Sequence, residues 1–277
     1  NELINESETM NNFNQLAALC LGKHIYIQTH NFPDPDAIAS VFGLQRLLAL
    51  HGIQSTLCYD GRIDKLSASK MLEAFRIEMF PYEQPRLNMT EEDYVICVDA
   101  QKHSGNITDF VGNEVACIDH HPTFVPMEYQ YQDIRLVGAC STLIAQYYQQ
   151  LSSKPDKDTA TALLYGLKMD TLQFTCGVTE LDIEMFAFLF PLCDQETLSR
   201  LERNNMEFSD LKAYGAAIER IELYDKVGLS YLPLPCPDAL IATISDFILA
   251  LQEVEVAIVF SLRADGIKFS VRSEDPD

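Results

Sequence analysis

The chain has 277 residues, 47% of them hydrophobic, enough to bury a sizeable core in one large domain or two ordinary ones. Its 41 acidic and 20 basic side chains give a formal net charge of −21, so we expect small anionic partners and no long nucleic acid, which needs a basic surface. No run approaches the roughly 20 apolar residues of a membrane span, and the scattered cysteines have no CxxC spacing, so we predict a cytoplasmic protein without a membrane partner.

The first distinctive stretch along the chain is HNFPDPDA, at residues 30–37. A β-rich segment, HIYIQT, precedes it, and a segment with helical periodicity follows at 37–51. The prolines bias their preceding residues away from α conformation, so we predict a stiff extended loop at a strand's carboxyl end. Such a loop would direct His30, Asp34 and Asp36 toward one point, although an isolated solvated turn uses the same residue types.

Strand-like and helix-like segments then alternate. The segments GIQSTLCYD, EEDYVICVDA and EVACIDHHP resemble strands, and 67–75 resembles a helix. This alternation predicts an α/β fold with a doubly wound, mainly parallel sheet. The second of these strands ends at Asp99 and the third at Asp119, His120 and His121. Because parallel strands share one carboxyl edge, these side chains should lie beside those of the first loop.

Helices dominate the next part of the chain. Ser141 begins the segment STLIAQYYQQL, either as a helix N-cap or as a phosphate contact. A second helix, at about 156–170, delivers Asp170 at its end. Lys168 beside it is either a phosphate contact or a solvent-exposed residue. We predict further helices near 180–190, 194–203 and 208–222.

The pattern changes near residue 224, where strand-like segments on either side of one helix indicate the start of a smaller α/β domain. We therefore expect a metal-binding domain at 1–203, a linker helix at 204–223 and a second, truncated domain at 224–277.

The side chains at the predicted sheet edge form a ligand set for two divalent cations. Carboxylates and imidazoles without cysteine suit Mn²⁺ best, with Mg²⁺ or Co²⁺ as alternatives. Four carboxylates and two neutral imidazoles balance two divalent ions, whereas without metal the carboxylates would repel one another. Separate loop caps are the alternative interpretation. The predicted ligands are His30, Asp34, Asp36, Asp99, His120 and Asp170.

Four segments in order, HNFPDPDA, VICVDA, IDHHP with GACST downstream, and GLKMDT, resemble the successive motifs of the DHH phosphoesterase family between residue 24 and about residue 174. The resemblance implies a DHH catalytic domain, a linker helix and a partial DHHA1-like substrate-binding domain over the three ranges given above. It implies one metal held by His30, Asp34 and Asp99. It implies a second held by Asp36, Asp99, His120 and Asp170, so that Asp99 bridges the two.

The resemblance also implies roles around the substrate. Asp119 would orient His120 or its loop, and His121 would contact the reacting phosphate. The segment SVRS resembles the start of the DHHA1 substrate-binding region, which makes Arg272 and Ser273 candidate substrate contacts; the Gly-rich, His-containing loop expected after it is absent. Arg263 and Arg272 are either clamps on a terminal phosphate or surface residues.

The activity implied by the resemblance is Mn²⁺-dependent hydrolysis of phosphoester bonds by a metal-activated water, with Asp99, Asp119 and His121 as catalytic residues. The implied substrates are short oligoribonucleotides, as for an exonuclease of the oligoribonuclease type, or adenosine 3′,5′-bisphosphate. Alternatives are cleavage of linear or cyclic dinucleotide signals or of pyrophosphate, and nucleotide sensing without turnover within a larger regulatory protein. The sequence leaves the oligomeric state open, including a homodimer.

Overall fold

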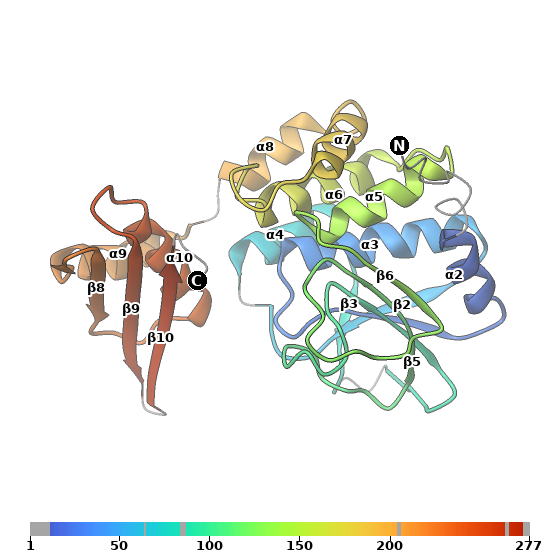
Figure 1. Cartoon of the computed structure of the whole chain (residues 1–277), viewed down its shortest axis with the longest axis horizontal. Helices are drawn as coiled ribbons and strands as arrows, with labels where there is room; N and C mark the ends of the chain where they lie inside the picture. The colour runs from blue at the N-terminus through green and yellow to red at the C-terminus, as the bar shows by residue number, and fades with distance from the viewer. Residues whose placement is uncertain (1–11, 64, 84–86, 204–205, 264–265, 274–277) are drawn as a thin grey trace, which may run out of the picture. The chain divides into compact units, whose positions relative to one another are not determined.

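The computed structural model describes residues 12–63, 65–83, 87–203, 206–263 and 266–273. The chain divides into two compact units, Asn1–Arg203 and Asn204–Asp277 (Figure 1). Each unit has its own β-sheet and its own hydrophobic core. Within the described ranges, no helix is long and apolar enough to cross a membrane.

The first unit contains a six-stranded sheet with strand order β3-β2-β1-β4-β5-β6, and all neighbouring strands pair in parallel. This is the strand order of a doubly wound sheet, so the predicted fold class is confirmed. The short strands β3 and β6 were not predicted, because three or four residues barely register a period-two pattern. The strands are β1 Ile25–Gln28, β2 Ser55–Tyr59, β3 Met79–Pro81, β4 Tyr94–Val98, β5 Asn113–Asp119 and β6 Tyr131–Ile134.

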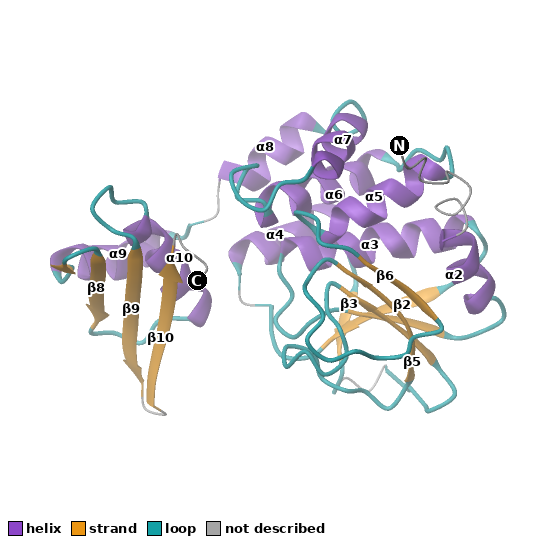
Figure 2. Cartoon of the chain, in the orientation of Figure 1, coloured by secondary structure: helices purple, strands orange, loops and turns teal. Residues whose placement is uncertain are grey.

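A doubly wound sheet usually carries helices on both faces, whereas the described helices of this unit lie on one face and loops cover the other (Figure 2). Alternate strand residues such as Ile25 and Ile27 pack under the helices, while Tyr26 packs under the loops. The β5–β6 connection runs through HPTFVPMEY, whose two prolines disfavour a helix on the second face. The helices are α2 Asn12–Cys20, α3 Pro35–Leu50, α4 Leu66–Phe75, α5 Cys140–Gln150, α6 Lys157–Asp170, α7 Glu180–Leu189 and α8 Gln195–Arg203.

The loop after β1 becomes helical earlier than predicted, so the expectation of an extended loop through residue 37 was wrong. Helix α3 begins at Pro35, and Asp34 is its N-cap, with Oδ1 accepting from the backbone N–H groups of Asp36, 3.1 Å away, and Ala37, 3.2 Å away. Proline suits the first helical position, since its fixed φ is already helical and that position needs no N–H donor.

The second unit contains a four-stranded sheet of order β10-β9-β8-β7, in which β8 and β9 pair in parallel and the other neighbours pair antiparallel. Its core includes Ala217 of α9, Ile244 of α10 and Val259 of β9. The elements are the 3-10 helix η1 Phe208–Asp210, α9 Leu211–Glu219, β7 Glu222–Tyr224, β8 Val227–Leu232, α10 Asp238–Leu249, β9 Val256–Arg263 and β10 Gly266–Ser273.

The stretch 204–223, predicted as one linker helix, contains η1 and the nine-residue α9, and β7 begins at Glu222. Residues 204–205 lie outside the described residues.

Candidate metal centre

The carboxyl ends of β1, β4 and β5 lie side by side, because β1 pairs with β4 and β4 pairs with β5 in parallel. The residues that follow these strands therefore meet at one edge of the sheet, and Asp170 joins them from the last turn of α6. The structure brings all six predicted ligands together there.

One group of ligand atoms belongs to His30, Asp34 and Asp99, which lie within 4.8 Å of one another. His30 Nε2 is 3.9 Å from Asp34 Oδ1 and 3.6 Å from Asp99 Oδ2. An imidazole and two carboxylates at this spacing offer one face of a coordination shell for a divalent ion.

A second group consists of Asp36, His120 and Asp170, again within 4.8 Å. His120 Nε2 is 3.4 Å from Asp170 Oδ2 and 3.2 Å from Asp99 Oδ1. Asp99 thus presents one oxygen to each group, as a bridging ligand requires.

Asp99 has an unusual backbone and an unsatisfied side chain. Its φ is 60°, in the left-handed region that residues other than glycine seldom adopt, and such outliers gather at functional sites. The residue is buried, and its Oδ1 has no hydrogen-bond partner among the described residues. His120 Nε2 lies 3.2 Å from this oxygen without hydrogen-bond geometry, so the buried carboxylate fits a cation at this point.

The orientation of both imidazoles is set by backbone carbonyls. Nδ1 of His30 donates to the carbonyl of Asn31 at 2.8 Å, and Nδ1 of His120 donates to that of Val137 at 3.0 Å. Since a carbonyl can only accept, each ring presents Nε2 to the carboxylates. This arrangement is typical of metal-binding histidines, whose second ring nitrogen donates to a carbonyl or carboxylate.

Asp36 is held by the amino-terminal end of α5. Its Oδ2 accepts from the N–H of Cys140 at 2.7 Å, and its Oδ1 accepts from the N–H of Ser141 at 3.0 Å and from the Ser141 hydroxyl. Oδ2 therefore keeps a lone pair for a metal ion. Ser141 is fully buried, and Ala139, not Ser141, is the N-cap. In this structure Ser141 positions a candidate ligand, whereas its predicted substrate contact stays a prediction.

The electrostatics of the cluster favour a cation. Burial, followed by repulsion from Asp99 and Asp170, raises the pKa of Asp36 well above its usual range. Burial, followed by repulsion from Asp34 and Asp99, raises the pKa of Asp170 to about 6. These shifts mean that the ionised carboxylates are destabilised by one another when no cation separates them.

The pKa values of the two imidazoles, His30 and His120, are raised, which compensates for the negative charge of the carboxylates. Burial lowers the pKa of His30, but the nearby carboxylates of Asp34 and Asp99 outweigh it and raise the pKa to about 11. Burial also lowers the pKa of His120, but the contact with Asp99 outweighs burial and raises the pKa to about 10. Protons on these rings thus neutralise the carboxylates when metal is absent, and a metal ion would have to displace them.

Asp119 and His121 form a second layer beside the ligands. Asp119 is buried, and its Oδ1 accepts from His121 Nδ1 at 2.9 Å. Gln101, which the sequence analysis missed, donates to Asp119 Oδ2 at 2.7 Å and to the carbonyl of His121 at 3.0 Å. Asp119 therefore contacts His121, which lies in the loop of His120, and not the His120 ring, whose Nδ1 donates to Val137. The side chain of His121 is 49% exposed, which leaves it accessible to a substrate.

The candidate phosphate contacts elsewhere have partners within the chain. Lys168 is half-buried and pairs with Glu202 of α8, so full solvent exposure was wrong. In the second unit, Arg272 Nε donates to Asp246 Oδ1 at 2.8 Å, and Arg263 donates to the carbonyl of Cys236. Ser273 ends the same strand as Arg272. Their contacts with substrate remain predictions.

Two glycines that the sequence analysis did not single out allow close packing at the site. A Cβ on Gly166 of α6 would meet Ser141 Oγ at 2.8 Å and Asp36 Cα at 3.1 Å. A Cβ on Gly138 would meet Asp182 Oδ2 at 2.8 Å, the oxygen that accepts from the Gly138 N–H. Helical periodicity alone cannot identify such positions, because the clash partners come from other elements.

Comparison with known proteins identifies the family. The model described as "DHH family, N-terminal domain" matches residues 24–167. An uncharacterised protein of Methanocaldococcus jannaschii is 30% identical over 255 residues, 91% of this chain and 52% of that protein. The cyclic-di-AMP phosphodiesterase GdpP of Geobacillus thermodenitrificans is 25% identical over 284 residues, 90% of this chain and 40% of that protein. The chain thus spans about half the length, or less, of these relatives.

Solved structures show the same fold. An exopolyphosphatase-related protein from Bacteroides fragilis has a TM-score of 0.79 at 18% identity, over 97% of this chain and 84% of that one. RecJ from Thermus thermophilus, solved in complex with Mn²⁺, has a TM-score of 0.52 at 15% identity, over 100% of this chain and 48% of that one.

Proposed function

The chain belongs to the DHH family of phosphoesterases, and on that premise we propose that it is a Mn²⁺-dependent hydrolase of short nucleotide substrates. These would be short oligoribonucleotides or adenosine 3′,5′-bisphosphate. The observation that carries the proposal is the position of Asp99, a buried carboxylate that faces both ligand groups.

The ligand groups divide the work of holding two ions. His30, Asp34 and Asp99 would hold one ion, and Asp36, Asp99, His120 and Asp170 the other. When bound, two such ions activate a water for attack on phosphorus and offset the charge of the phosphoryl oxygens. No side-chain nucleophile is required. The oxygen and nitrogen ligands suit Mn²⁺, and Mg²⁺ or Co²⁺ is the alternative to be compared.

His121 would stabilise the phosphoryl group during the reaction. Its Nδ1 donates to the buried Asp119, so Nε2 is the nitrogen that can meet a substrate oxygen. The hydrogen bond to Asp119 raises the pKa of His121, which favours its protonated, donating form. Gln101 holds this pair in place through both of its hydrogen bonds.

The acidity of the chain supports a small substrate. A net charge of −21 repels long polyanions. A short nucleotide presents one reacting phosphate that the metal ions can compensate locally, so its binding depends less on the field of the whole protein.

A substrate panel tests the proposal. We expect release of mononucleotide from a linear dinucleotide with Mn²⁺, no release after chelation, and slower cleavage of oligonucleotides well beyond five residues. Adenosine 3′,5′-bisphosphate and pyrophosphate belong on the same panel. If no short substrate is turned over with Mn²⁺, the proposal is contradicted and nucleotide sensing without turnover is favoured.

A second candidate, cleavage of a cyclic dinucleotide, is favoured by the similarity to GdpP across 90% of this chain. Cyclic di-AMP is therefore included with the linear dinucleotide. Faster turnover of the cyclic substrate would replace the first candidate with the second.

A further inference from the structure

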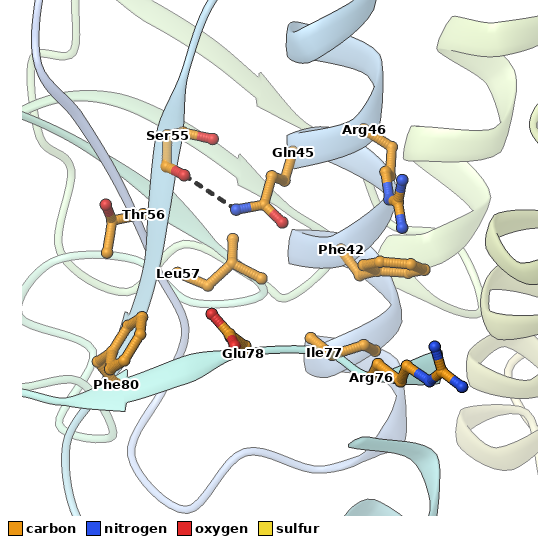
Figure 3. A pocket seen from close by; sticks show the side chains of 10 residues that line it. All are labelled: Phe42, Gln45, Arg46, Ser55, Thr56, Leu57, Arg76, Ile77, Glu78 and Phe80. Atoms are coloured by element: carbon orange, nitrogen blue, oxygen red, sulfur yellow. Dashed lines mark hydrogen bonds between the residues drawn. The ribbon is translucent and has the colours of Figure 1, made fainter. Parts of the chain in front are cut away.

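A hollow of about 360 Å³ lies at the opposite end of α3 from the metal ligands (Figure 3). Gln45 and Arg46 line it from the later turns of α3, Thr56 from β2, and Arg76 and Glu78 from the segment between α4 and β3. Its volume falls within the range of small-molecule sites, which is about 300 to 1,000 Å³.

Two arginines in this hollow have no acidic partner within the part of the chain that the structure describes. Neither Arg46 nor Arg76 forms a side-chain hydrogen bond or ion pair with any residue that the structure describes; Arg46 instead lies over the Phe42 ring, 5.0 Å from its centroid. By contrast, Arg135 is bound to Asp133 at 2.6 Å. In a chain with about twice as many acidic as basic residues, two arginines in one hollow that pair with no described carboxylate, not even with Glu78 of the same hollow, are unexpected.

The backbone at Arg76 adds a second observation. Arg76 is the C-cap of α4 with φ 52°, a left-handed position where glycine is the usual residue. A side chain there is strained, because its Cβ crowds the following carbonyl oxygen. The arginine at this position places a second guanidinium on the hollow.

The polar groups are separated by charge across the hollow. In the view of Figure 3, both guanidinium groups lie on one side, next to Phe42, and Glu78 and Thr56 lie on the other. Gln45 Nε2 donates to the carbonyl of Ser55 at 2.9 Å, which fixes the amide and leaves its oxygen available as an acceptor.

We propose that this hollow binds a phosphomonoester the size of a mononucleotide, at a site separate from the metal centre. Arg46 and Arg76 bind the phosphate, since guanidinium groups donate to phosphate oxygens in pairs. Glu78 and the side-chain oxygen of Gln45 accept from the sugar and base. The proposal does not depend on which substrate the metal centre cleaves.

The test is calorimetric titration of AMP into the full chain loaded with Mn²⁺. AMP holds a phosphomonoester but no phosphodiester bond. We expect two binding events in the wild type if the proposed function also holds. One event should disappear in R46Q/R76Q, and each single variant should weaken that event about tenfold, the effect of losing one charge-assisted hydrogen bond.

Matched variants separate this site from the metal centre. Arg200→Gln, on the exposed face of α8, should leave both events unchanged. Asp99→Asn should abolish only the event at the metal centre. The wild type could also show a single binding event. If R46Q/R76Q abolishes that event and Asp99→Asn does not, AMP binds in the hollow and the proposed function is contradicted.

Three results would overturn the proposal. R46Q/R76Q could retain the AMP stoichiometry and a Kd within twofold of the wild type. NMR signals of the guanidinium Nε–H groups of Arg46 and Arg76 could fail to shift on AMP addition, a readout that needs no variant. Inorganic phosphate or ribose 5-phosphate could match the affinity of AMP at this site, which would exclude recognition of a whole mononucleotide.

Discussion

The two ends of α3 differ in almost every property that matters for binding. At its first turn, Asp36 is buried among other carboxylates and depends on cations for compensation. Three turns later, Arg46 is exposed, unpaired among described residues, and positioned for an anion. The helix macrodipole favours the acid at the start, Asp36, but not Arg46, which lies before the last turn of α3. Asp36 and Arg46 thus differ in burial. A buried charge requires a counterion, whereas an exposed charge can bind a counterion but is also stabilised by water.

The largest effect should come from Asp99→Asn. Losing a ligand shared by both groups removes several kcal/mol of transition-state stabilisation, so turnover with saturating Mn²⁺ should fall by about 10³-fold or more. AMP binding at the arginine hollow should persist. Asp225→Asn, in the exposed β7–β8 turn, is the matched control. Retained turnover would mean that the ligands are misassigned.

Asp36→Ala should lose one metal ion before both. Asp36 belongs to only one ligand group, so metal titration followed by elemental analysis should show one ion retained at a concentration that fills both sites of the wild type. Asp36→Asn keeps an oxygen for the α5 amides and should lose the same ion with less loss of stability. Equal loss of both ions would indicate that the first turn of α3 serves a single-ion site.

Gly166→Ala should destabilise the fold by about 1–3 kcal/mol, since the added methyl group overpacks the space between α6, Ser141 and Asp36. Gly215→Ala, also within a helix, meets nothing within 4 Å and should stabilise by up to about 1 kcal/mol. Urea unfolding of both variants measures the difference. Equal effects would show that the first turn of α3 is not rigidly packed.

The smallest effect concerns Asp170 and pH. In the metal-free protein its pKa of about 6 exceeds the unfolded value near 4. The folded state therefore keeps a proton that the unfolded state loses, and this residue's contribution to stability falls as pH rises from about 4 to about 6. The melting temperature of Asp170→Asn minus that of the wild type should increase between pH 4 and pH 6. With Mn²⁺ bound, this trend with pH should reverse. A difference in melting temperature that does not change with pH would show that the other carboxylates do not shift the pKa of Asp170.

Much of the fold could be predicted from the sequence, because its signals are local. Short apolar, β-rich runs predicted β1, β4 and β5, and the polar residues at or just after their ends placed His30, Asp99 and Asp119 at one edge of a parallel sheet. The strand order confirms that fold class. Metal binding by these residues stays a prediction, although their distances suit it.

Other features depended on contacts between distant residues. The sequence determined which side chains reach the sheet edge, since strand period and strand ends are properties of neighbouring residues. Only the tertiary structure decided that Asp119 pairs with His121, that the α5 amides hold Asp36, and that helices cover one face. It alone brought Arg46 and Arg76 into one hollow. These arrangements arise from packing between elements far apart in the chain, which no local pattern records.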